Sequence, residues 1–511
     1  MEIADPVRPW PDFMRKPRTL AALLGLTSGS MLVAVGTLLS PLVAGAVVLG
    51  GLVAGAAMYS PFVSVLLTAA VVPLERVGRF TNDNSAVTFS LMRVLGLLGL
   101  ASLLLHAFLT RTRLRVPLPV LLYAAHVFVC CLTLTYTTDF LDGFKWCGTM
   151  VGNLLFLFFV INAVRFSRQV RWPVILWLAT TLLVGLFTMY QWHSGTAVVQ
   201  DDRFANSGFR TTDDRFSTVI IDYAEFDEIG AVKRVLGATS HPAVYALNVI
   251  LTIPFYVFIL VTTDSWWMRI FSIAGLLVGS YNVLLTNTRA AMLALVLSLL
   301  LTFCSRLVKY RFAIVVAAIA VCGVAAPFLP SALYQRVLSA KNYSVGRSAA
   351  IQIRFQYWRA GVDMFADHWL LGVGSGNQKE LPRRLSNVRM PPNTSIHNEY
   401  LESLLETGIV GYPLIVSFIV VLFRRCLQVT RRARESGDRH LYLFGVSTVI
   451  AFVTVLVFGL QCDVFHFTLK GWWLLMGLVV GIHGMNPVTG PKEGQLQIAG
   501  PLPPLESADA Q

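Results

Sequence analysis

Long apolar blocks recur along the whole chain, and they constrain its fold more than any other feature of the sequence. A helix that crosses the hydrocarbon core of a bilayer needs roughly 20 apolar residues, and most of the blocks are close to that length. Only 14% of the residues are charged, while 55% are hydrophobic, which is more apolar material than the core of a soluble domain buries. The sequence therefore predicts an all-α polytopic membrane protein.

Fourteen such blocks are candidate spans. Gly- and Ala-rich sequence blurs the boundaries of the first three, so we expect about 12–14 transmembrane helices. The candidates lie near residues 19–39, 41–58, 60–75, 88–110, 116–135, 144–163, 171–190, 239–262, 268–286, 290–306, 311–329, 398–423, 441–460 and 469–486.

Lys and Arg gather in the short connections on one side of these spans. Such clusters mark the cytoplasmic side of a membrane protein. Sixteen of the 41 Lys and Arg residues sit in them. Their simpler role is to set membrane orientation, so the net charge of +13 does not indicate a nucleic-acid partner. The chain then divides into a cytoplasmic leader (1–18), N-terminal spans (19–190), a first outer loop (191–238), central spans (239–329), a second outer loop (330–397), C-terminal spans (398–486) and a disordered cytoplasmic tail (487–511).

The two long outer loops differ in charge. Residues 191–238 hold eight acids and five bases, whereas residues 330–397 hold nine bases and three acids. The second loop therefore suits an anion, although a solvated basic face would have the same composition. Apolar residues within it recur every three or four positions and predict an amphipathic helix that lies on the membrane or caps the bundle. They are Ile351, Phe355, Trp358, Val362, Phe365 and Trp369.

Gly372, Gly374 and Gly376 follow this predicted helix directly. A glycine turn can bring backbone N–H groups close to a phosphate, or it can simply reverse the chain after a helix. A pattern this short favours the ordinary turn.

Three basic side chains stand where the chain enters a span from the outer face: Arg234, Arg289 and His397. A charge beside a span either extends to the interface or needs a partner or ligand. A neutral imidazole accepts a proton near physiological pH, and guanidiniums neutralise phosphate oxygens. Together these groups suit attack at a carbon that bears a phosphorylated leaving group.

Glu399, Glu402 and Glu406 follow that histidine at spacings of three and four residues, which places them on roughly one helical face. Glu406 also begins a Glu-x-Gly-x-x-Gly run with Gly408 and Gly411. Because small residues let a neighbouring helix approach closely, we expect the two glycines to serve packing.

These elements occur in an order that resembles the O-antigen ligase and O-antigen polymerase superfamily. The resemblance covers about residues 230–415, while the amino-terminal spans are similar only in hydropathy. It rests on Arg234-x-x-Gly237 with His241-Pro242, the Asn-Thr-Arg-Ala-Ala run at 287–291, Arg354-x-x-Tyr357-Trp358-x-x-Gly361, Gly372-Val373-Gly374, and His397-Asn398-x-Tyr400 followed by Glu406-x-Gly408-x-x-Gly411.

The resemblance implies a multi-pass enzyme of the bacterial inner (cytoplasmic) membrane with an active site that faces the periplasm. Such an enzyme moves a glycan from an undecaprenyl-pyrophosphate-linked donor to an acceptor hydroxyl, with inversion and without a metal or cofactor. The family's base-like histidine corresponds to His397, and its pyrophosphate-binding arginines correspond to Arg289 and Arg234, with Arg203, Arg210 and Arg215 as alternatives to the latter. Supporting roles fall to Arg347, Arg354, Tyr357, Asn398, Tyr400 and Glu406.

The acceptor stays open. A ligase uses lipid A-core, a polymerase of O-antigen or exopolysaccharide uses a second carrier-linked glycan, and a protein O-oligosaccharyltransferase belongs to the same chemical class.

A secondary transporter, with Arg289, His397 and Asp463 along a solute path, is a different alternative, but the sequence has no evident internal repeat. A noncatalytic scaffold for other polysaccharide-assembly proteins would not need three basic side chains at one face. Besides its glycan substrates, the expected partner is membrane lipid.

Overall fold

The computed structural model describes the chain in ten stretches: residues 41–74, 90–196, 198–201, 219–223, 232–239, 241–305, 349–376, 396–462, 464–465 and 469–484. The predicted leader, the predicted tail and the candidate spans at 19–39 and 311–329 lie outside these stretches.

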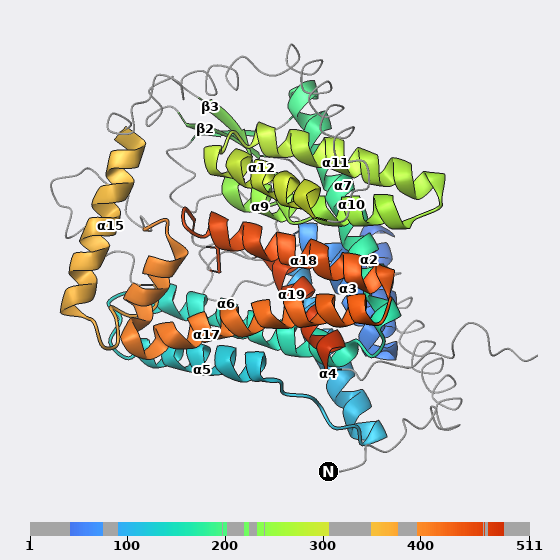
Figure 1. The fold of residues 1–511 in the computed structure, drawn as a ribbon, viewed down its shortest axis with the longest axis horizontal. Coiled ribbons are helices and arrows are strands. Elements are labelled where there is room, and N and C mark those ends of the chain that lie inside the picture. The colour runs from blue at the N-terminus through green and yellow to red at the C-terminus, as the bar shows by residue number, and fades with distance from the viewer. Residues whose placement is uncertain are drawn as a thin grey trace, which may run out of the picture.

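Helices dominate the described residues (Figure 1). Seven of them are long and apolar enough to cross a membrane, and four shorter apolar helices of 10–17 residues accompany them. The predicted all-α polytopic membrane fold is confirmed. The helices are α2 (Pro41–Tyr59), α3 (Pro61–Val71), α4 (Leu91–Thr110), α5 (Leu118–Thr133), α6 (Phe140–Ala163), α7 (Arg171–Ser194), α9 (Pro242–Ile250), α10 (Ile253–Thr262), α11 (Trp266–Leu285), α12 (Arg289–Cys304), α15 (Ala349–Asp367), α17 (Glu399–Glu435), α18 (Arg439–Phe458) and α19 (Lys470–His483).

The last helix, α19, lies in the middle of the bundle. Every residue from Gly471 to Ile482 is buried, as expected of a helix that is apolar on all sides. Its Gly477 packs so closely on Val160 of α6 that a Cβ there would lie 2.6 Å from the valine side chain. Two tryptophans of α19 meet aromatic rings of α5, α17 and α18. The cluster contains Tyr123, Phe418, Phe452, Trp472 and Trp473.

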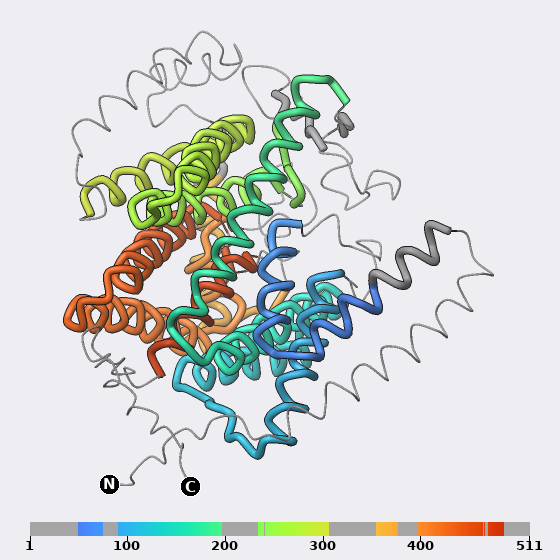
Figure 2. The backbone as a smooth tube through the Cα atoms, turned by 90° about the vertical axis from the view of Figure 1, so that its right-hand side faces the viewer, coloured from blue at the N-terminus to red at the C-terminus, as the bar shows by residue number. Residues whose placement is uncertain are grey.

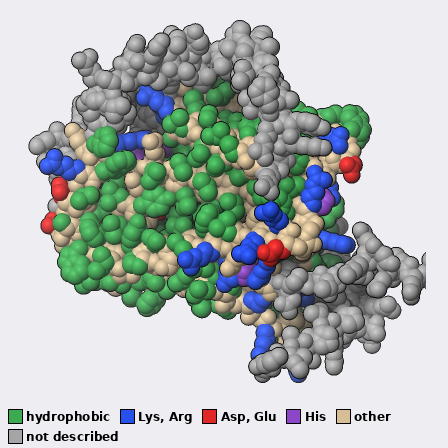
Figure 3. Space-filling view, in the orientation of Figure 1, with side chains coloured by type: hydrophobic (Ala, Val, Ile, Leu, Met, Phe, Trp, Pro, Cys, Tyr) green, Lys and Arg blue, Asp and Glu red, His purple; other side chains and the backbone are tan. Residues whose placement is uncertain are grey.

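The surface of the bundle is apolar where lipid would surround it. Figure 3 shows a broad hydrophobic face with Lys and Arg side chains gathered mainly along its lower right edge. Large apolar side chains such as Phe108, Phe128 and Leu183 are more than half exposed on the described helices. An exposed apolar area of this extent marks a surface that is covered by another phase or molecule, here the hydrocarbon layer.

A small sheet interrupts the helical architecture within the first long loop, which sequence reasoning did not anticipate. It contains β1 (Val198–Asp201), β2 (Val219–Tyr223) and β3 (Val232–Val235). The order is β1-β2-β3, with β1 parallel and β3 antiparallel to β2. The strands are short, and apolar and polar residues alternate poorly along them. Their pattern is therefore hard to distinguish from loop sequence.

The helices α9, α12 and α17 begin at the same end of the bundle, here called the loop end. Helices α9 and α10 form one span, Pro242–Thr262, and short turns reverse the chain before α11 and again before α12. At the end of α18, Phe458 faces Ala243 and Leu247 of α9 across a small apolar cavity. Since a short turn joins α17 to α18, α17 also begins at the loop end. Figure 2 shows the same grouping, with residues 241–305 beside the orange and red helices.

Arg115, in the connection between α4 and α5, joins three helices at the end of the bundle opposite the loop end. Its backbone N–H donates to Asn162 Oδ1 at 2.7 Å, and Asn162 Nδ2 donates to its carbonyl at 3.0 Å. Its guanidinium donates to the carbonyl oxygens of Gly481 and Ile161, at 3.3 and 3.1 Å. These oxygens belong to the last turns of α19 and α6, where carbonyls lack helical partners and a cation is favoured. Burial, and to a smaller extent the nearby Arg165, lowers the pKa of Arg115.

We predict that Arg115→Ala lowers the free energy of unfolding by about 2 kcal/mol, because charge-assisted hydrogen bonds to helix carbonyls are lost. The midpoint of thermal unfolding in detergent, followed by tryptophan fluorescence, measures the effect. The matched control is Arg113→Ala, since Arg113 is exposed in the same connection. Equal midpoints for the two variants would contradict the assignment.

Candidate active site

The three basic residues singled out in the sequence lie at the loop end. His397 directly precedes α17, Arg289 is the first residue of α12, and Arg234 lies in β3 shortly before α9. They come from separate elements, and the fold brings those elements to one end of the bundle. The opposite arrangement, with Arg289 and His397 on different sides, is not found.

Arg289 places a cation at the start of a helix. The first turn of α12 contains no acid, and its backbone N–H groups favour an anion in front of them. Asn287, two residues earlier, is buried and has a left-handed φ of 52°, which asparagine tolerates better than most residues. The guanidinium and the helix terminus therefore contribute potential of the same sign.

Arg234 lies on the last strand of the sheet, opposite Ile221 of β2. The chain is fixed immediately after it. Val235 is fully buried, and Gly237 has a φ of 55° and packs against the ring of Tyr245, where a Cβ has no room. Tyr245 in turn donates from its hydroxyl to Asn282 Oδ1 of α11 at 2.9 Å. The strand that carries Arg234 is thus attached to the helices that end or begin beside Arg289.

His397 occupies a sharp turn between the basic loop and α17. Its φ is 55°, a left-handed conformation that is uncommon for a residue with a side chain, and the residue is partly exposed. Asn398 then caps α17, because its Oδ1 accepts the backbone N–H groups of Tyr400 and Leu401 at 3.1 and 3.2 Å. The turn places His397 directly before the cap of α17.

The three glutamates after the histidine are buried and each binds a different loop segment. Glu399, Glu402 and Glu406 are 2%, 5% and 3% exposed. Each carboxylate accepts a backbone N–H from another segment of the loop end. The pairs are Glu399 with Phe465 at 2.8 Å, Glu402 with Ile396 at 3.1 Å and Glu406 with Gly376 at 2.9 Å.

The start of α17 is also bonded to the end of α18. Glu399 donates its backbone N–H to the carbonyl of Gly459 at 2.9 Å, and the Tyr400 hydroxyl donates to the carbonyl of Leu456 at 2.7 Å. Arg354 of α15 donates to Gln461 Oε1, just beyond α18, at 3.2 Å. The end of α18 and the residues just beyond it are therefore bonded to both α17 and α15.

The glycine turn after α15 is structural. Gly372, Gly374 and Gly376 all have positive φ values, 77°, 96° and 73°. All five backbone N–H groups from 372 to 376 donate to protein acceptors, so none is left for a phosphate. The acceptors are the carbonyls of His368, Leu405 and Glu406, the Thr133 hydroxyl and the Glu406 carboxylate.

The glycine turn fits into a break in α17. Gly408 has a φ of 58° and a ψ of −163°, so the helix changes direction there. Ile409 and Val410, past the break, donate their backbone N–H groups to the carbonyls of Trp369 and Leu370 at 3.0 and 3.3 Å. The expected packing role of the glycines is thus found, but at Gly408 the partner is a turn and not a helix. Gly411 does face a helix, since a Cβ there would lie 3.0 Å from Val129 of α5.

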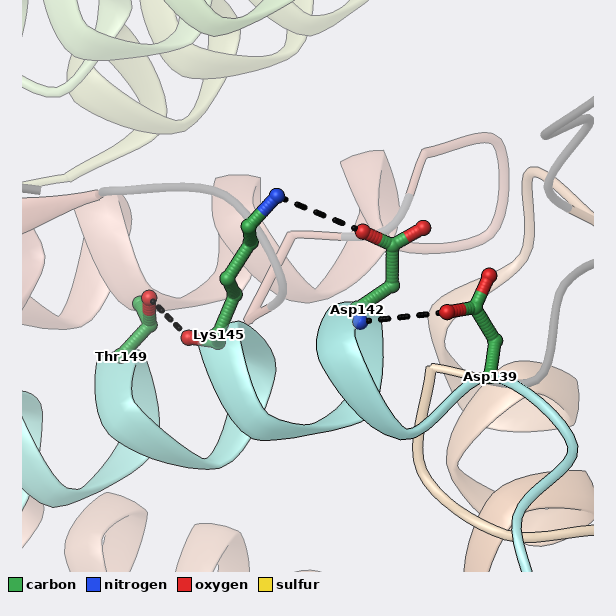
Figure 4. A network of polar contacts seen from close by, with 4 residues as sticks. All are labelled: Asp139, Asp142, Lys145 and Thr149. Atoms are coloured by element: carbon green, nitrogen blue, oxygen red, sulfur yellow. Dashed lines mark hydrogen bonds and ion pairs between the residues drawn. The ribbon is translucent and has the colours of Figure 1, made fainter. Parts of the chain in front are cut away.

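Helix α6 begins beside the same turn. Asp139 caps it by accepting the Asp142 N–H at 3.4 Å, and Lys145 lies 3.6 Å from the Asp142 carboxylate (Figure 4). One residue further, Trp146 Nε1 donates to Glu406 Oε2 at 3.4 Å. Glu406 thus binds both the glycine turn and α6.

Helix α15 stands across the loop end of the bundle and contacts α17 (Figure 1). Its described buried residues are Tyr357, Ala360, Gly361 and Met364, so the face that packs on α17 lies beside the predicted apolar stripe. Phe355, Val362 and Trp369 of that stripe are 57%, 56% and 51% exposed, whereas Trp358 and Phe365 are partly buried. On the packed face, Gly361 lets α15 approach Leu401 and Leu405 closely.

The supporting residues have mainly structural contacts. Tyr357 belongs to the hydrophobic cluster between α15 and α17, and Asn398, Tyr400 and Glu406 hold the start of α17 as described. Arg347 lies outside the described residues. Among the described residues, no group of three His, Cys, Asp or Glu side chains is arranged to hold a metal ion.

Sequence reasoning missed the partners of Glu399 and Glu402 and the role of Trp358, whose Nε1 donates to the carbonyl of Ile396 at 3.2 Å. Acids spaced by three and four residues in an otherwise apolar helix were the available signal. Such carboxylates are costly to bury without donors, so they indicate loops that must supply N–H groups.

We predict that Gly408→Ala prevents or strongly destabilises folding. An added Cβ would collide with the carbonyl of Leu370, and the left-handed backbone would be strained. The yield of monodisperse protein and its thermal unfolding midpoint measure this. Gly148→Ala in α6 is the control, because nothing lies within 4 Å of its position. A Gly408→Ala protein as stable as the control would refute the close approach.

Residues 274–416 match a family model described as O-antigen ligase. The matched range starts within α11, contains Arg289 and His397, and ends in α17 after the break at Gly408; Arg234 lies before it. No curated protein matches the chain. The match over residues 274–416 supports membership of the O-antigen ligase and polymerase superfamily, as the sequence resemblance indicated.

Proposed function

We propose that the protein transfers a glycan from an undecaprenyl-pyrophosphate-linked donor to an acceptor hydroxyl at the periplasmic face of the bacterial inner membrane, as an O-antigen ligase or a polysaccharide polymerase. The family match supports glycan transfer in general. The observation that carries the finer proposal is the placement of the His397 imidazole and the Arg289 guanidinium at one end of the bundle.

The reaction follows from the chemistry of these groups. The acceptor hydroxyl oxygen attacks the anomeric carbon of the donor sugar as the bond to the pyrophosphate oxygen breaks. His397 takes the hydroxyl proton, and the leaving carrier pyrophosphate keeps the electron pair. Arg289, at the amino end of α12, and Arg234 neutralise the charge that develops on the leaving group. Attack from the face opposite the leaving group inverts the anomeric centre, and the guanidiniums supply the charge that a metal would otherwise provide.

Position favours this proposal over transport. Binding sites of secondary transporters lie near the bilayer midplane, between repeated bundles. Arg289 and His397 lie instead at the ends of helices. Asp463, the third residue of the transport alternative, lies outside the described residues.

We predict that His397→Ala lowers the rate constant of transfer by at least about 100-fold, the usual contribution of a positioned base. Purified protein in nanodiscs is given a fluorescent undecaprenyl-pyrophosphate-linked oligosaccharide and an acceptor, and the product is resolved on a gel. His440→Ala, an exposed histidine at the opposite end, should behave as wild type. Full activity of a folded His397→Ala protein would remove the base assignment.

Arg289→Ala should reduce kcat/KM by about 10- to 100-fold, the effect of losing charge-assisted hydrogen bonds to phosphate. Arg289→Lys should recover part of the loss, since lysine keeps the charge but not the forked geometry. Arg434→Ala, exposed at the opposite end, is the matched control. An unchanged kcat/KM in Arg289→Ala would exclude donor binding by this arginine.

The same assay separates the possible acceptors. Lipid A-core as the productive acceptor identifies a ligase, a second carrier-linked glycan identifies a polymerase, and a serine- or threonine-containing peptide identifies a protein O-oligosaccharyltransferase. The basic composition of the second loop does not distinguish among these three acceptors.

A further inference from the structure

The residue before His397 is held on every side. The backbone N–H of Ile396 donates to Glu402 Oε2 at 3.1 Å, and its carbonyl accepts from Trp358 Nε1 at 3.2 Å. Its side chain is 4% exposed and packs with Tyr357, Ala360, Met364 and Leu405. Both backbone polar groups of Ile396 and its side chain are therefore fixed by α15 and α17.

The residue after His397 is held by the same glutamate. Glu402 donates its own backbone N–H to the carbonyl of Asn398 at 2.8 Å. One residue of α17 thus bonds both neighbours of the histidine, the first through its side chain and the second through its backbone. His397 itself has a left-handed backbone, a conformation that persists only where the surroundings impose it.

We propose that Glu402 and Trp358 are positioning residues that hold His397 for proton transfer, and that they act on the rate of transfer and not on donor binding. The inference rests on the proposed function, in which His397 is the base. Neither side chain needs to touch a substrate, because each acts through Ile396. Through Trp358, the large basic loop also takes part in positioning His397, since α15 belongs to that loop.

The proposal separates two roles that a buried glutamate can have. If the glutamate only stabilises the fold, its substitution lowers the melting temperature and leaves the kinetics of the folded protein unchanged. If the glutamate is a positioning residue, its substitution lowers kcat of the folded protein with little change in KM for the donor. A displacement near 1 Å of a reacting group can slow a reaction by about 100-fold.

The experiment compares substitutions that remove or retain one hydrogen-bonding atom. Glu402→Leu keeps the approximate shape and loses the acceptor, whereas Glu402→Gln retains an acceptor oxygen. Trp358→Phe loses the Nε1 donor and keeps an aromatic ring. The controls are Glu435→Leu and Trp267→Phe, both exposed residues far from the loop end. The full chain in nanodiscs is assayed with the fluorescent undecaprenyl-pyrophosphate-linked oligosaccharide, and thermal unfolding verifies that each variant is folded.

We expect kcat to fall about 10- to 100-fold in Glu402→Leu and about 3- to 10-fold in Trp358→Phe, with donor KM within about threefold of wild type in both. Glu402→Gln should restore kcat to within about threefold of wild type. Hydrogen exchange should increase in the peptide that contains 396–401 in Glu402→Leu and not in Glu402→Gln.

Wild-type kcat in folded Glu402→Leu, or a Glu402→Gln protein as slow as Glu402→Leu, overturns the inference. Where Glu402→Leu does not fold, an unchanged kcat in Trp358→Phe overturns it. His397→Ala distinguishes this failure from that of the proposed function: an inactive His397→Ala beside a fully active Glu402→Leu refutes only the positioning role, whereas an active His397→Ala refutes the base itself.

Discussion

Burial of carboxylates at the start of α17 is the constraint on which the loop end depends. Each of Glu399, Glu402 and Glu406 is nearly inaccessible, and a carboxylate removed from water must find donors inside the protein. Backbone N–H groups of loops fulfil that need, and the loops in turn lose the freedom to move independently. Two connections, from α15 to α17 and from α18 to α19, are thereby gathered around one helix start, next to His397.

The glycine turn illustrates how the need for donors determines backbone conformation. Glu406 takes the N–H of Gly376 and the indole N–H of Trp146, so the turn must pass between α6 and α17. Only glycine fits this passage, because the backbone is left-handed at Gly372, Gly374 and Gly376 and the neighbouring atoms leave no room for side chains. A motif that looks like a ligand-binding loop is here a means of joining two helices.

The all-α polytopic architecture could be predicted from the sequence, because the hydropathy of long apolar blocks identifies membrane spans with little dependence on tertiary detail. Alternation of the spans was sufficient to place Arg289 and His397 at the same end. The sheet around Arg234 was not predictable, since its strands are only four or five residues long. The helix α15 was predictable from its apolar period, but the face that packs on α17 was not, because Tyr357, Ala360 and Met364 are buried there while Phe355 and Val362 of the apolar stripe are exposed. Which group accepts the hydrogen bond of a particular backbone N–H, such as that of Ile396, depends on the completed fold. The local sequence contains no signal for it.

The break at Gly408 also determines how deep the site lies. Beyond it, the apolar run from Ile409 to Phe423 is fifteen residues long, about 22 Å at 1.5 Å per residue, whereas the hydrocarbon layer is about 30 Å thick. With Arg424 and Arg425 at one boundary of that layer, the break falls about 8 Å short of the other boundary. The nine residues from Glu399 to Thr407 span about 14 Å of helix, which is long enough to bring the turn at His397 out to that boundary. An amphiphile whose ionic portion hangs at that level would meet the histidine without leaving its own leaflet.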